Sequence, residues 1–245
     1  MKFSLVILTK NSEHTLPDVI KSVPTANEIV IVDDYSTDNT PNIARNLGAR
    51  VYRRYINNDF AKQRNYALSK TKNEWVLFLD SDEIASEELI KGITRLDNVQ
   101  VDGFYIRRSE VFLQKKLTAG EWGSIQLVRF GKKSRGGWKR AIHEYWDINN
   151  TALLQGEIIH NADNTLSSLI SKINRYSQIH ARENKLENKK ASLSIVVSKP
   201  IGKFIANYIV RLGFRDGVAG FVYAVLMSFH SFLAWSTLWL NSRKK

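Results

Sequence analysis

The stretch EWVLFLDSDE, residues 74–83, joins a run of apolar side chains to a cluster of three carboxylates. A short continuous apolar run bounded by polar residues is typical of a strand that is buried on both faces. We therefore expect a buried strand over Glu74–Leu79, with Asp80 and Asp82 in the turn that follows it.

The sequence before this stretch repeats the same pattern, with helical spacing between the apolar runs. The expected strands are Phe3–Thr9, Glu28–Asp33 and Ala49–Tyr52, and the expected helices are Leu16–Val23, Asn42–Leu47 and Ala61–Ser69. Strands that alternate with helices are joined by right-handed crossovers. The sequence therefore predicts an α/β fold with a doubly wound, mostly parallel sheet.

The pattern changes twice after this first part. Residues 100–160 alternate short strands with loops, and Gly103–Arg108 and Ile125–Phe130 are the clearest strands. From Leu166 onward the apolar residues have helical spacing, with Pro200 expected to break the helical region. We expect an α/β domain over 1–165 and a helical C-terminal region over 166–245.

The composition of the 245-residue chain excludes some chemistry. The chain has no cysteine, which rules out disulfides, thiolate zinc sites and cysteine nucleophiles. The formal net charge is +12, of which residues 161–245 carry +9. An anionic partner is therefore expected at the C-terminal third, either a membrane surface or a nucleic acid.

Polar residues follow three of the expected strands, where the carboxyl ends of a parallel sheet form a binding edge. Asp80 and Asp82 are separated by one residue, and their carboxylates can converge on one Mg²⁺ or Mn²⁺. A solvated acidic turn has the same pattern. Asp34 could accept hydrogen bonds from a base or a ribose. Arg64, on a helix, would on its own be a surface charge.

Four segments in this order carry a resemblance: VILTKN (6–11), IVIVDDYSTDNT (29–40), FAKQRNYAL (60–68) and WVLFLDSDE (75–83). Together they resemble the glycosyltransferase family 2 enzymes, which have the GT-A fold. The resemblance continues through 141–144, 159–160 and 172–176. With GFRDG at 213–217, the last of these is similar to the lipopolysaccharide-core β-glucosyltransferase subgroup.

The resemblance implies roles for residues of this chain that match the family positions. Thr9, Asp34, Arg64 and Asp80 match positions that bind the nucleotide-sugar donor. Asp82 matches the direct ligand of a divalent cation, Mg²⁺ or Mn²⁺. Asp80 and His160 match the other family positions around that cation.

The resemblance also implies the catalytic base. Glu144 matches the position of the family's general base, although the family's usual Glu-Asp pair is His-Glu here. His143 is a candidate to orient Glu144. The Gln-x-x-Arg-Trp motif of processive synthases is absent, which implies that one sugar is added per encounter.

General chemistry agrees with this implied function. Sugar transfer needs a cation that stabilises a diphosphate leaving group and a carboxylate that deprotonates the acceptor hydroxyl, with inversion at the anomeric carbon. Paired carboxylates also serve glycoside hydrolases, and the basic C-terminal part could instead belong to a nucleic-acid-binding module. The uncharged apolar stretch inside that basic part argues against nucleic acid as a partner.

The C-terminal third has the composition of a membrane-associating segment. Lys199, Lys203, Arg211 and Arg215 lie among apolar residues, and 218–242 contains no charged side chain. This stretch could lie on a membrane, cross it, or form a core helix. No secretory signal is recognisable at the start of the sequence. We therefore expect a cytoplasmic protein attached peripherally to the inner face of the cell membrane, with a glycolipid or saccharide acceptor.

Overall fold

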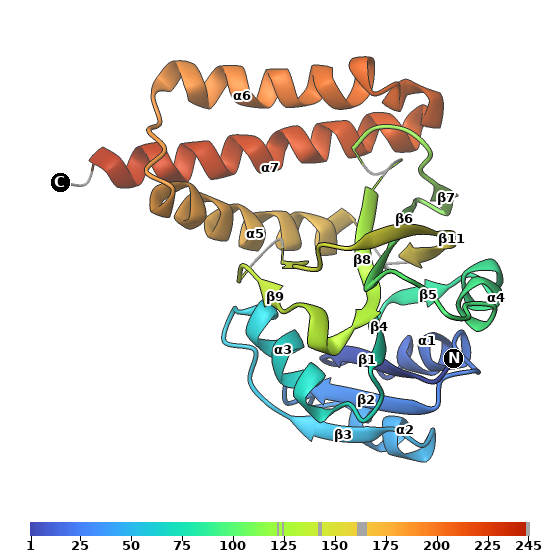
Figure 1. Ribbon diagram of the computed structural model, residues 1–245. Helices are drawn as coiled ribbons and strands as arrows, with labels where there is room; N and C mark the ends of the chain where they lie inside the picture. The colour runs from blue at the N-terminus through green and yellow to red at the C-terminus, as the bar shows by residue number, and fades with distance from the viewer. Residues whose placement is uncertain (122, 124, 142–143, 161–165, 244–245) are drawn as a thin grey trace. The chain divides into compact units, whose positions relative to one another are not determined.

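The structure is a computed structural model that describes residues 1–121, 123, 125–141, 144–160 and 166–243. The predicted site residue His143 lies outside the described residues. The chain forms two compact units, each made of two segments (Figure 1). The first comprises Met1–Ser109 with Ile125–Asn161, and the second comprises Glu110–Ser124 with Ala162–Lys245.

A parallel sheet forms the base of the first unit. Its strands are β1 (Phe3–Thr9), β2 (Glu28–Asp33), β3 (Arg50–Arg53) and β4 (Trp75–Asp80), in the spatial order β3-β2-β1-β4. Every residue of β1 is buried, because the sheet is covered on both faces. The strand order reverses between β1 and β4, which is where α/β sheets bind ligands.

Helices cover the two faces of this sheet. The helices are α1 (Leu16–Lys21), α2 (Thr40–Asn46), α3 (Phe60–Lys70) and α4 (Glu87–Thr94). One core cluster joins Leu5 and Ile7 of β1 to α1, α2 and α4, and the other joins Val6 and Leu8 to α3. Alternate β1 side chains thus enter opposite layers, as the period of a strand requires. The predicted α/β fold is confirmed.

An antiparallel extension continues the sheet beyond β4. Its strands are β5 (Glu83–Ala85), β6 (Gly103–Phe112), β8 (Ile125–Lys132) and β11 (Thr151–His160), in the order β4-β8-β6-β11-β5. The two-residue strand β7 (Lys115–Lys116) pairs with the end of β6. The extension brings residues from distant parts of the sequence to the carboxyl end of β4.

A separate two-stranded sheet packs against β4 in the first unit. It consists of β9 (Trp138–Lys139), which follows the 3₁₀ turn η1 (Lys133–Arg135), and β10 (Tyr145–Trp146). The rings of Trp138 and Trp146 stack at 5.5 Å and both meet Phe78 of β4 edge-on. This aromatic cluster fixes the segment that carries Glu144.

The second unit is helical. Its elements are α5 (Leu166–Leu186), α6 (Leu193–Ile205), a π-helical turn η2 (Ala206–Val210), a 3₁₀ turn η3 (Gly213–Asp216) and α7 (Gly217–Arg243). In Figure 1 the three long helices run side by side, with α7 between α5 and α6. Two stretches, Leu193–Val210 and Gly213–Arg243, are long and apolar enough to cross a membrane, and only 17% and 28% of their respective windows are buried.

The prediction that Pro200 breaks the helical region is wrong. Pro200 lies inside α6, is buried, and its carbonyl accepts a hydrogen bond from the Ser228 hydroxyl of α7 at 2.8 Å. A proline inside a helix removes one backbone hydrogen bond and costs about 3 kcal/mol. The packing of α6 on α7 overrides this local preference.

Candidate active site

The predicted donor residues Thr9 and Asp34 lie at the carboxyl ends of β1 and β2. The Asp34 N–H donates to the Thr9 carbonyl at 2.9 Å, which joins the two strand ends. The Asp34 carboxylate accepts from the Lys10 ammonium at 2.8 Å and from the Ile56 N–H at 3.0 Å. The Thr9 hydroxyl oxygen is buried without a hydrogen-bond partner in the described part of the chain.

A pair of tyrosines stands beside Asp34. The rings of Tyr35 and Tyr55 stack at 3.9 Å with an interplanar angle of 16°, and both side chains are exposed. Tyr35 has a φ of +51°, in the left-handed region that a bulky residue rarely adopts. The strained backbone and the exposed stack give this edge of the sheet a surface on which a planar ring can lie.

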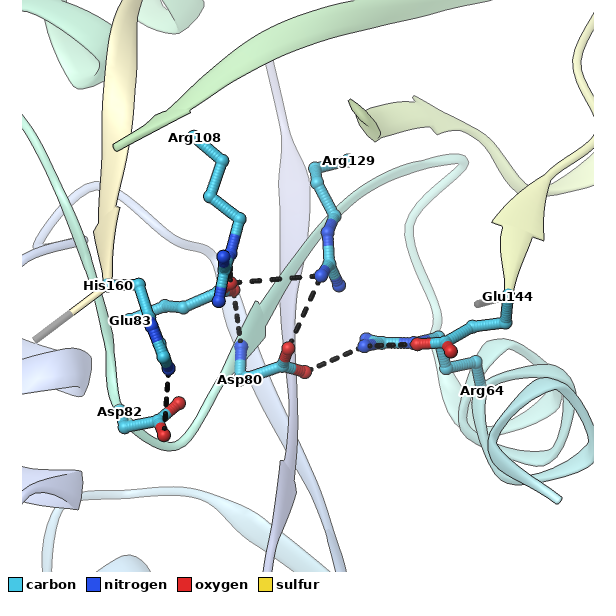
Figure 2. A network of polar contacts seen from close by, with 8 residues as sticks. All are labelled: Arg64, Asp80, Asp82, Glu83, Arg108, Arg129, Glu144 and His160. Carbon is cyan, nitrogen blue, oxygen red and sulfur yellow. Dashed lines mark hydrogen bonds and ion pairs between the residues drawn. The ribbon is translucent and has the colours of Figure 1, made fainter. Parts of the chain in front are cut away.

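Arg64 joins two of the predicted site carboxylates (Figure 2). Its Nη2 lies 2.7 Å from Asp80 Oδ1 and 2.9 Å from Glu144 Oε1, and its Nε donates to the same Glu144 oxygen at 3.0 Å. Only 1% of the Arg64 side chain is exposed. Arg64 comes from α3, Asp80 ends β4, and Glu144 precedes β10, so three distant segments meet at one guanidinium.

Two further arginines, which the sequence analysis did not single out, complete the network. Arg129 of β8 lies 3.3 Å from Asp80 Oδ2 and 3.8 Å from Glu83 Oε1. Arg108 of β6 donates to the same Glu83 oxygen at 2.6 Å, and the Asp80 N–H donates to the other Glu83 oxygen at 2.9 Å. Three arginines thus balance three carboxylates, as buried charges require.

The arginines control the protonation of Asp80. Burial alone would raise its pKa, but the positive charges of Arg64 and Arg129 outweigh burial and hold the pKa far below its ordinary value. The pKa of Arg129 is correspondingly raised, since the neighbouring Glu83 and Asp80 carboxylates outweigh the effect of its own burial. Asp80 is therefore a permanent anion at neutral pH.

Two guanidinium nitrogens in this network lack a hydrogen-bond acceptor. Arg64 Nη1 and Arg129 Nη1 are buried, and neither has a partner in the described ranges of the chain. The Arg64 guanidinium carbon lies 4.6 Å from the centre of the Trp138 ring, so this cation is shielded from water by an aromatic face. Unsatisfied buried donors of this kind are suited to the oxygens of an anionic ligand.

Asp82 and His160 form a second group of polar side chains. The register that pairs β5 with β11 places His160 opposite Glu83, next to Asp82. His160 Nε2 lies 3.1 Å from Asp82 Oδ2, and both side chains are partly buried. The hydroxyl of Ser81, between the two aspartates, lies 2.8 Å from the Ser12 hydroxyl. The acidic turn is thus tied to the loop after β1.

Residues 4–154 match the model of the family described as Glycosyl transferase family 2. The chain belongs to glycosyl transferase family 2. The matched range contains β1 to β4, the Asp80–Arg64–Glu144 group and the acidic turn. The family predicted from the sequence is confirmed, and the chain is a glycosyltransferase.

The family 2 relatives include curated proteins of similar length. An uncharacterized glycosyltransferase of Rickettsia typhi is 28% identical over 252 residues, which covers 95% of this chain and 85% of that protein. The poly(ribitol-phosphate) beta-N-acetylglucosaminyltransferase TarS of Staphylococcus aureus is 38% identical over 102 residues, or 37% of this chain and 18% of that protein.

Solved structures have the same fold. The crystal structure of Staphylococcus aureus TarS 1-349 gives a TM-score of 0.51 at 18% identity and covers all of this chain and 92% of that one. The complex of the same protein with UDP-GlcNAc also gives 0.51, at 18% identity, over 95% of this chain and 82% of that one.

Two of the predicted metal ligands, Asp82 and His160, fit a divalent cation, whereas Asp80 faces arginines instead. Among the residues the structure describes, no three or more histidine, aspartate or glutamate side chains gather to hold a metal ion. Both Asp80 oxygens face arginines, whereas Asp82 and His160 offer a carboxylate oxygen and an imidazole nitrogen 3.1 Å apart. Mg²⁺ and Mn²⁺ often take only one or two protein ligands and complete their shell with substrate phosphates and water. Asp82 and His160 therefore fit such an ion.

The structure brings some predicted site residues together and separates others. Arg64, Asp80 and Glu144 share one network, Asp82 and His160 form a pair, and Thr9 and Asp34 form a third group at the β1 and β2 ends. Arg108 and Arg129 were missed, and Glu83 was part of the predicted acidic cluster but had no predicted role. The sequence signal for Arg129 was a charged residue between the apolar residues of the LVRF segment, 127–130.

Proposed function

We propose that this glycosyltransferase moves one sugar from a nucleotide-diphosphate donor to an acceptor hydroxyl, with inversion at the anomeric carbon. The observation that carries the proposal is the bridge from Asp80 through Arg64 to Glu144. It couples a carboxylate at the donor-binding edge of the sheet to a carboxylate suited to be a base. That arrangement suits a reaction in which a proton is removed while a diphosphate leaves.

Glu144 is the proposed general base. Both of its contacts with Arg64 use Oε1, so the bond to Arg64 orients the carboxylate without engaging Oε2. In the proposed step Oε2 takes the proton of the acceptor hydroxyl as the acceptor oxygen bonds to the anomeric carbon. The bond from that carbon to the diphosphate oxygen breaks at the same time, and the nucleoside diphosphate leaves with the bonding electrons.

Asp34, Thr9 and the buried arginine donors are proposed to hold the nucleotide sugar. Asp34 suits a hydrogen bond with the base or ribose, and the exposed Tyr35–Tyr55 stack stands beside it. The unsatisfied Nη1 groups of Arg64 and Arg129 suit anionic oxygens. The complexes of TarS with UDP and with UDP-GlcNAc are consistent with a uridine nucleotide as the first donor to test.

A divalent cation, Mg²⁺ or Mn²⁺, is proposed at Asp82 and His160, where it would neutralise the negative charge that develops on the diphosphate. Asp80, held as an anion by two arginines, is proposed to orient the ribose and the water ligands of that cation. The Asp82 carboxylate is the group on which binding of the cation depends most, because hard cations prefer carboxylate oxygen.

The finer features of the acceptor are also proposals. The resemblance to the lipopolysaccharide-core subgroup supports a glycolipid or saccharide acceptor in cell-envelope glycan synthesis, with one hexose added per encounter. The basic, apolar second unit supports peripheral attachment to the inner face of the cell membrane. That nucleic acid is not a partner stays a prediction.

The test is a screen of nucleotide sugars with Mg²⁺ or Mn²⁺ and simple glycoside acceptors. Released nucleoside diphosphate is measured first, and the anomeric configuration of the product is then read by NMR. We expect transfer of a single sugar, with the anomeric configuration inverted relative to the donor. A product with retained configuration, or a free sugar formed from glycosides without any nucleotide donor, would contradict the proposal.

A further inference from the structure

The second unit contains a pocket that has no part in the proposed transfer. It has a volume of about 460 Å³ and lies between the loop that follows β7 and the turn between α6 and α7. Thr118, Gly120 and Glu121 line it from the loop, and Arg211, Leu212 and Arg215 line it from the turn. Its lining therefore combines apolar surface with the side chains of two arginines and one glutamate.

A buried carboxylate fixes the two walls of this pocket to each other. Asp216 is only 2% exposed and accepts hydrogen bonds from the Thr118 N–H at 3.0 Å, the Thr118 hydroxyl at 2.8 Å and the Ala119 N–H at 2.9 Å. The Gly120 N–H donates to the Arg211 carbonyl at 2.9 Å. The pocket is thus preformed within the unit.

The turn that carries the arginines has an unusual backbone. The π-helical turn η2 precedes it, and Leu212 has a φ of +58°. Gly213 packs so closely that an added Cβ would lie 2.6 Å from the Asn207 carbonyl oxygen. Bulky residues in the left-handed region are strained and cluster at ligand-binding and switch sites. Arg211 and Arg215 lie on either side of the strained Leu212 in the pocket wall.

The two arginines contribute charge that no carboxylate among the described residues neutralises. Neither Arg211 nor Arg215 forms an ion pair in the part of the chain that the structure describes, and both are exposed. The carboxylate of Glu121 is engaged by the Lys203 ammonium at 2.7 Å. The planar guanidinium groups are thus available for an anion, and their geometry suits phosphate oxygens.

Exposed apolar side chains alternate with these arginines along the chain. Val210 is 70% exposed, Phe214 48% and Val218 76%, and Leu212, which lines the pocket, is 37% exposed. A soluble ion would gain nothing from this apolar surface. Cationic residues interleaved with exposed apolar ones are the pattern of a segment at the surface of an anionic bilayer.

We propose that this pocket binds the phosphate of an anionic phospholipid headgroup, with Arg211 and Arg215 as its ligands and the adjoining apolar side chains in the acyl boundary. The inference rests on the membrane attachment proposed above and assigns it to a defined site. It does not depend on turnover, because headgroup binding needs neither donor nor acceptor.

The test is flotation of the full-length protein with vesicles of phosphatidylglycerol in phosphatidylcholine, and with phosphatidylcholine alone. Arg211→Gln combined with Arg215→Gln should weaken binding to the anionic vesicles about 30-fold, the equivalent of about 1 kcal/mol for each basic residue. Lys185→Gln combined with Lys190→Gln is the matched control. It removes the same charge from the same unit, outside the pocket, and should weaken binding several-fold less.

Three results would overturn the inference. An equal loss of vesicle binding in both double variants would mean that the net positive charge of the unit, and not this pocket, attracts the membrane. The headgroup site would then be wrong, and the proposed membrane attachment would still hold. Wild-type protein that floats with neither kind of vesicle would refute membrane attachment as well. Glycerol phosphate or inorganic phosphate that binds as tightly as the anionic vesicles would make the ligand a free phosphate. Nucleoside diphosphate release, measured separately, reports on the proposed transfer.

Discussion

Arg64 illustrates how one side chain can serve both folding and chemistry. Its guanidinium stabilises two carboxylates that would repel each other without it, and it lies against the rings of Phe78 and Trp138. A lysine could not replace it, because an ammonium lacks the planar fork that reaches both acids. The ion pair with Arg64 therefore holds Glu144 in place. A variant that alters the Glu144 carboxylate and keeps its contact with Arg64 tests the chemistry without disturbing this packing.

Glu144→Gln keeps the size of the side chain and a hydrogen-bond acceptor for Arg64 but removes the proton acceptor. We expect the turnover rate to fall by about 10²-fold to 10⁴-fold, with little change in donor affinity. Steady-state kinetics together with calorimetric donor binding measure the two effects separately. Glu87→Gln, on the exposed face of α4, is the control and should retain full activity. Unchanged turnover in Glu144→Gln would assign the base to another group.

His160 is the second proposed ligand of the cation, and the site should depend on it less than on the Asp82 carboxylate. His160→Ala removes the imidazole nitrogen and leaves the Asp82 carboxylate, so the Mn²⁺ concentration for half-maximal activity should rise at least tenfold. The measurement is the rate as a function of Mn²⁺ concentration. His14→Ala, at a side chain that is 91% exposed, should leave the curve unchanged. The same Mn²⁺ dependence in His160→Ala and wild type would remove His160 from the site.

At the scale of elements, Gly156 allows α4 to pack closely on β11. Its φ is +91°, and an added Cβ would lie 2.3 Å from the Leu89 backbone nitrogen. Gly156→Ala should therefore lower the free energy of unfolding by more than the about 1–2 kcal/mol that left-handed backbone alone costs. Gly48→Ala is the matched control, because Gly48 has a φ of +81° but open space around its Cα. Urea unfolding of both variants measures the difference, and equal losses would contradict the close packing.

Glu28 ties β2 to β1 and β3 at the amino end of the sheet. Burial would raise its pKa, but hydrogen bonds from the Ser4 hydroxyl and the Lys72 N–H, together with the Arg50 charge, hold the pKa below its ordinary value. A carboxylate whose pKa is depressed by folding stabilises the fold above its unfolded pKa, and this contribution is lost as the pH falls through the folded pKa.

Glu28→Gln should therefore lower the free energy of unfolding at pH 7 by about 1–3 kcal/mol, the usual range for hydrogen bonds to a charged group. The difference from wild type should shrink below about pH 4, where the carboxylate of the unfolded chain is protonated. Denaturant titrations at a series of pH values provide the measurement. A difference that is constant from pH 7 to acid pH would mean that ionisation of Glu28 contributes nothing.

The parallel strands β1 to β4 were predictable because their signal is local, whereas β5, β9, β10 and β11 were not predicted. The bounds of β1 and β2 agree with the predicted Phe3–Thr9 and Glu28–Asp33, since each is an uninterrupted apolar run. The helix through Pro200 was not predictable, because packing on α7 decides it. The same reason hid Arg108 and Arg129. Antiparallel pairing of β6 with β8, and of β8 with β4, brings Arg129 to Asp80 and Arg108 to Glu83, and the local sequence does not specify which strands pair.

At the scale of the whole molecule, the proposed chemistry and the excess charge belong to different units. The site residues described above all lie within Met1–Ser109 and Ile125–Asn161, whereas residues 161–245 carry +9 of the net charge. Most of the residues that match the family 2 model, 4–154, belong to the first unit. Transfer is thus proposed for the first unit and membrane attachment for the second.

The most direct test of the central claim is the initial rate of nucleoside diphosphate release by wild type and Asp82→Ala at saturating Mn²⁺, each repeated in excess chelator. Asp82 is partly exposed, so the variant should fold normally, as circular dichroism would verify. We expect release only by wild type with the cation present, because the leaving diphosphate needs its charge neutralised. Release by Asp82→Ala at the wild-type rate, or undiminished wild-type release in chelator, would contradict this claim.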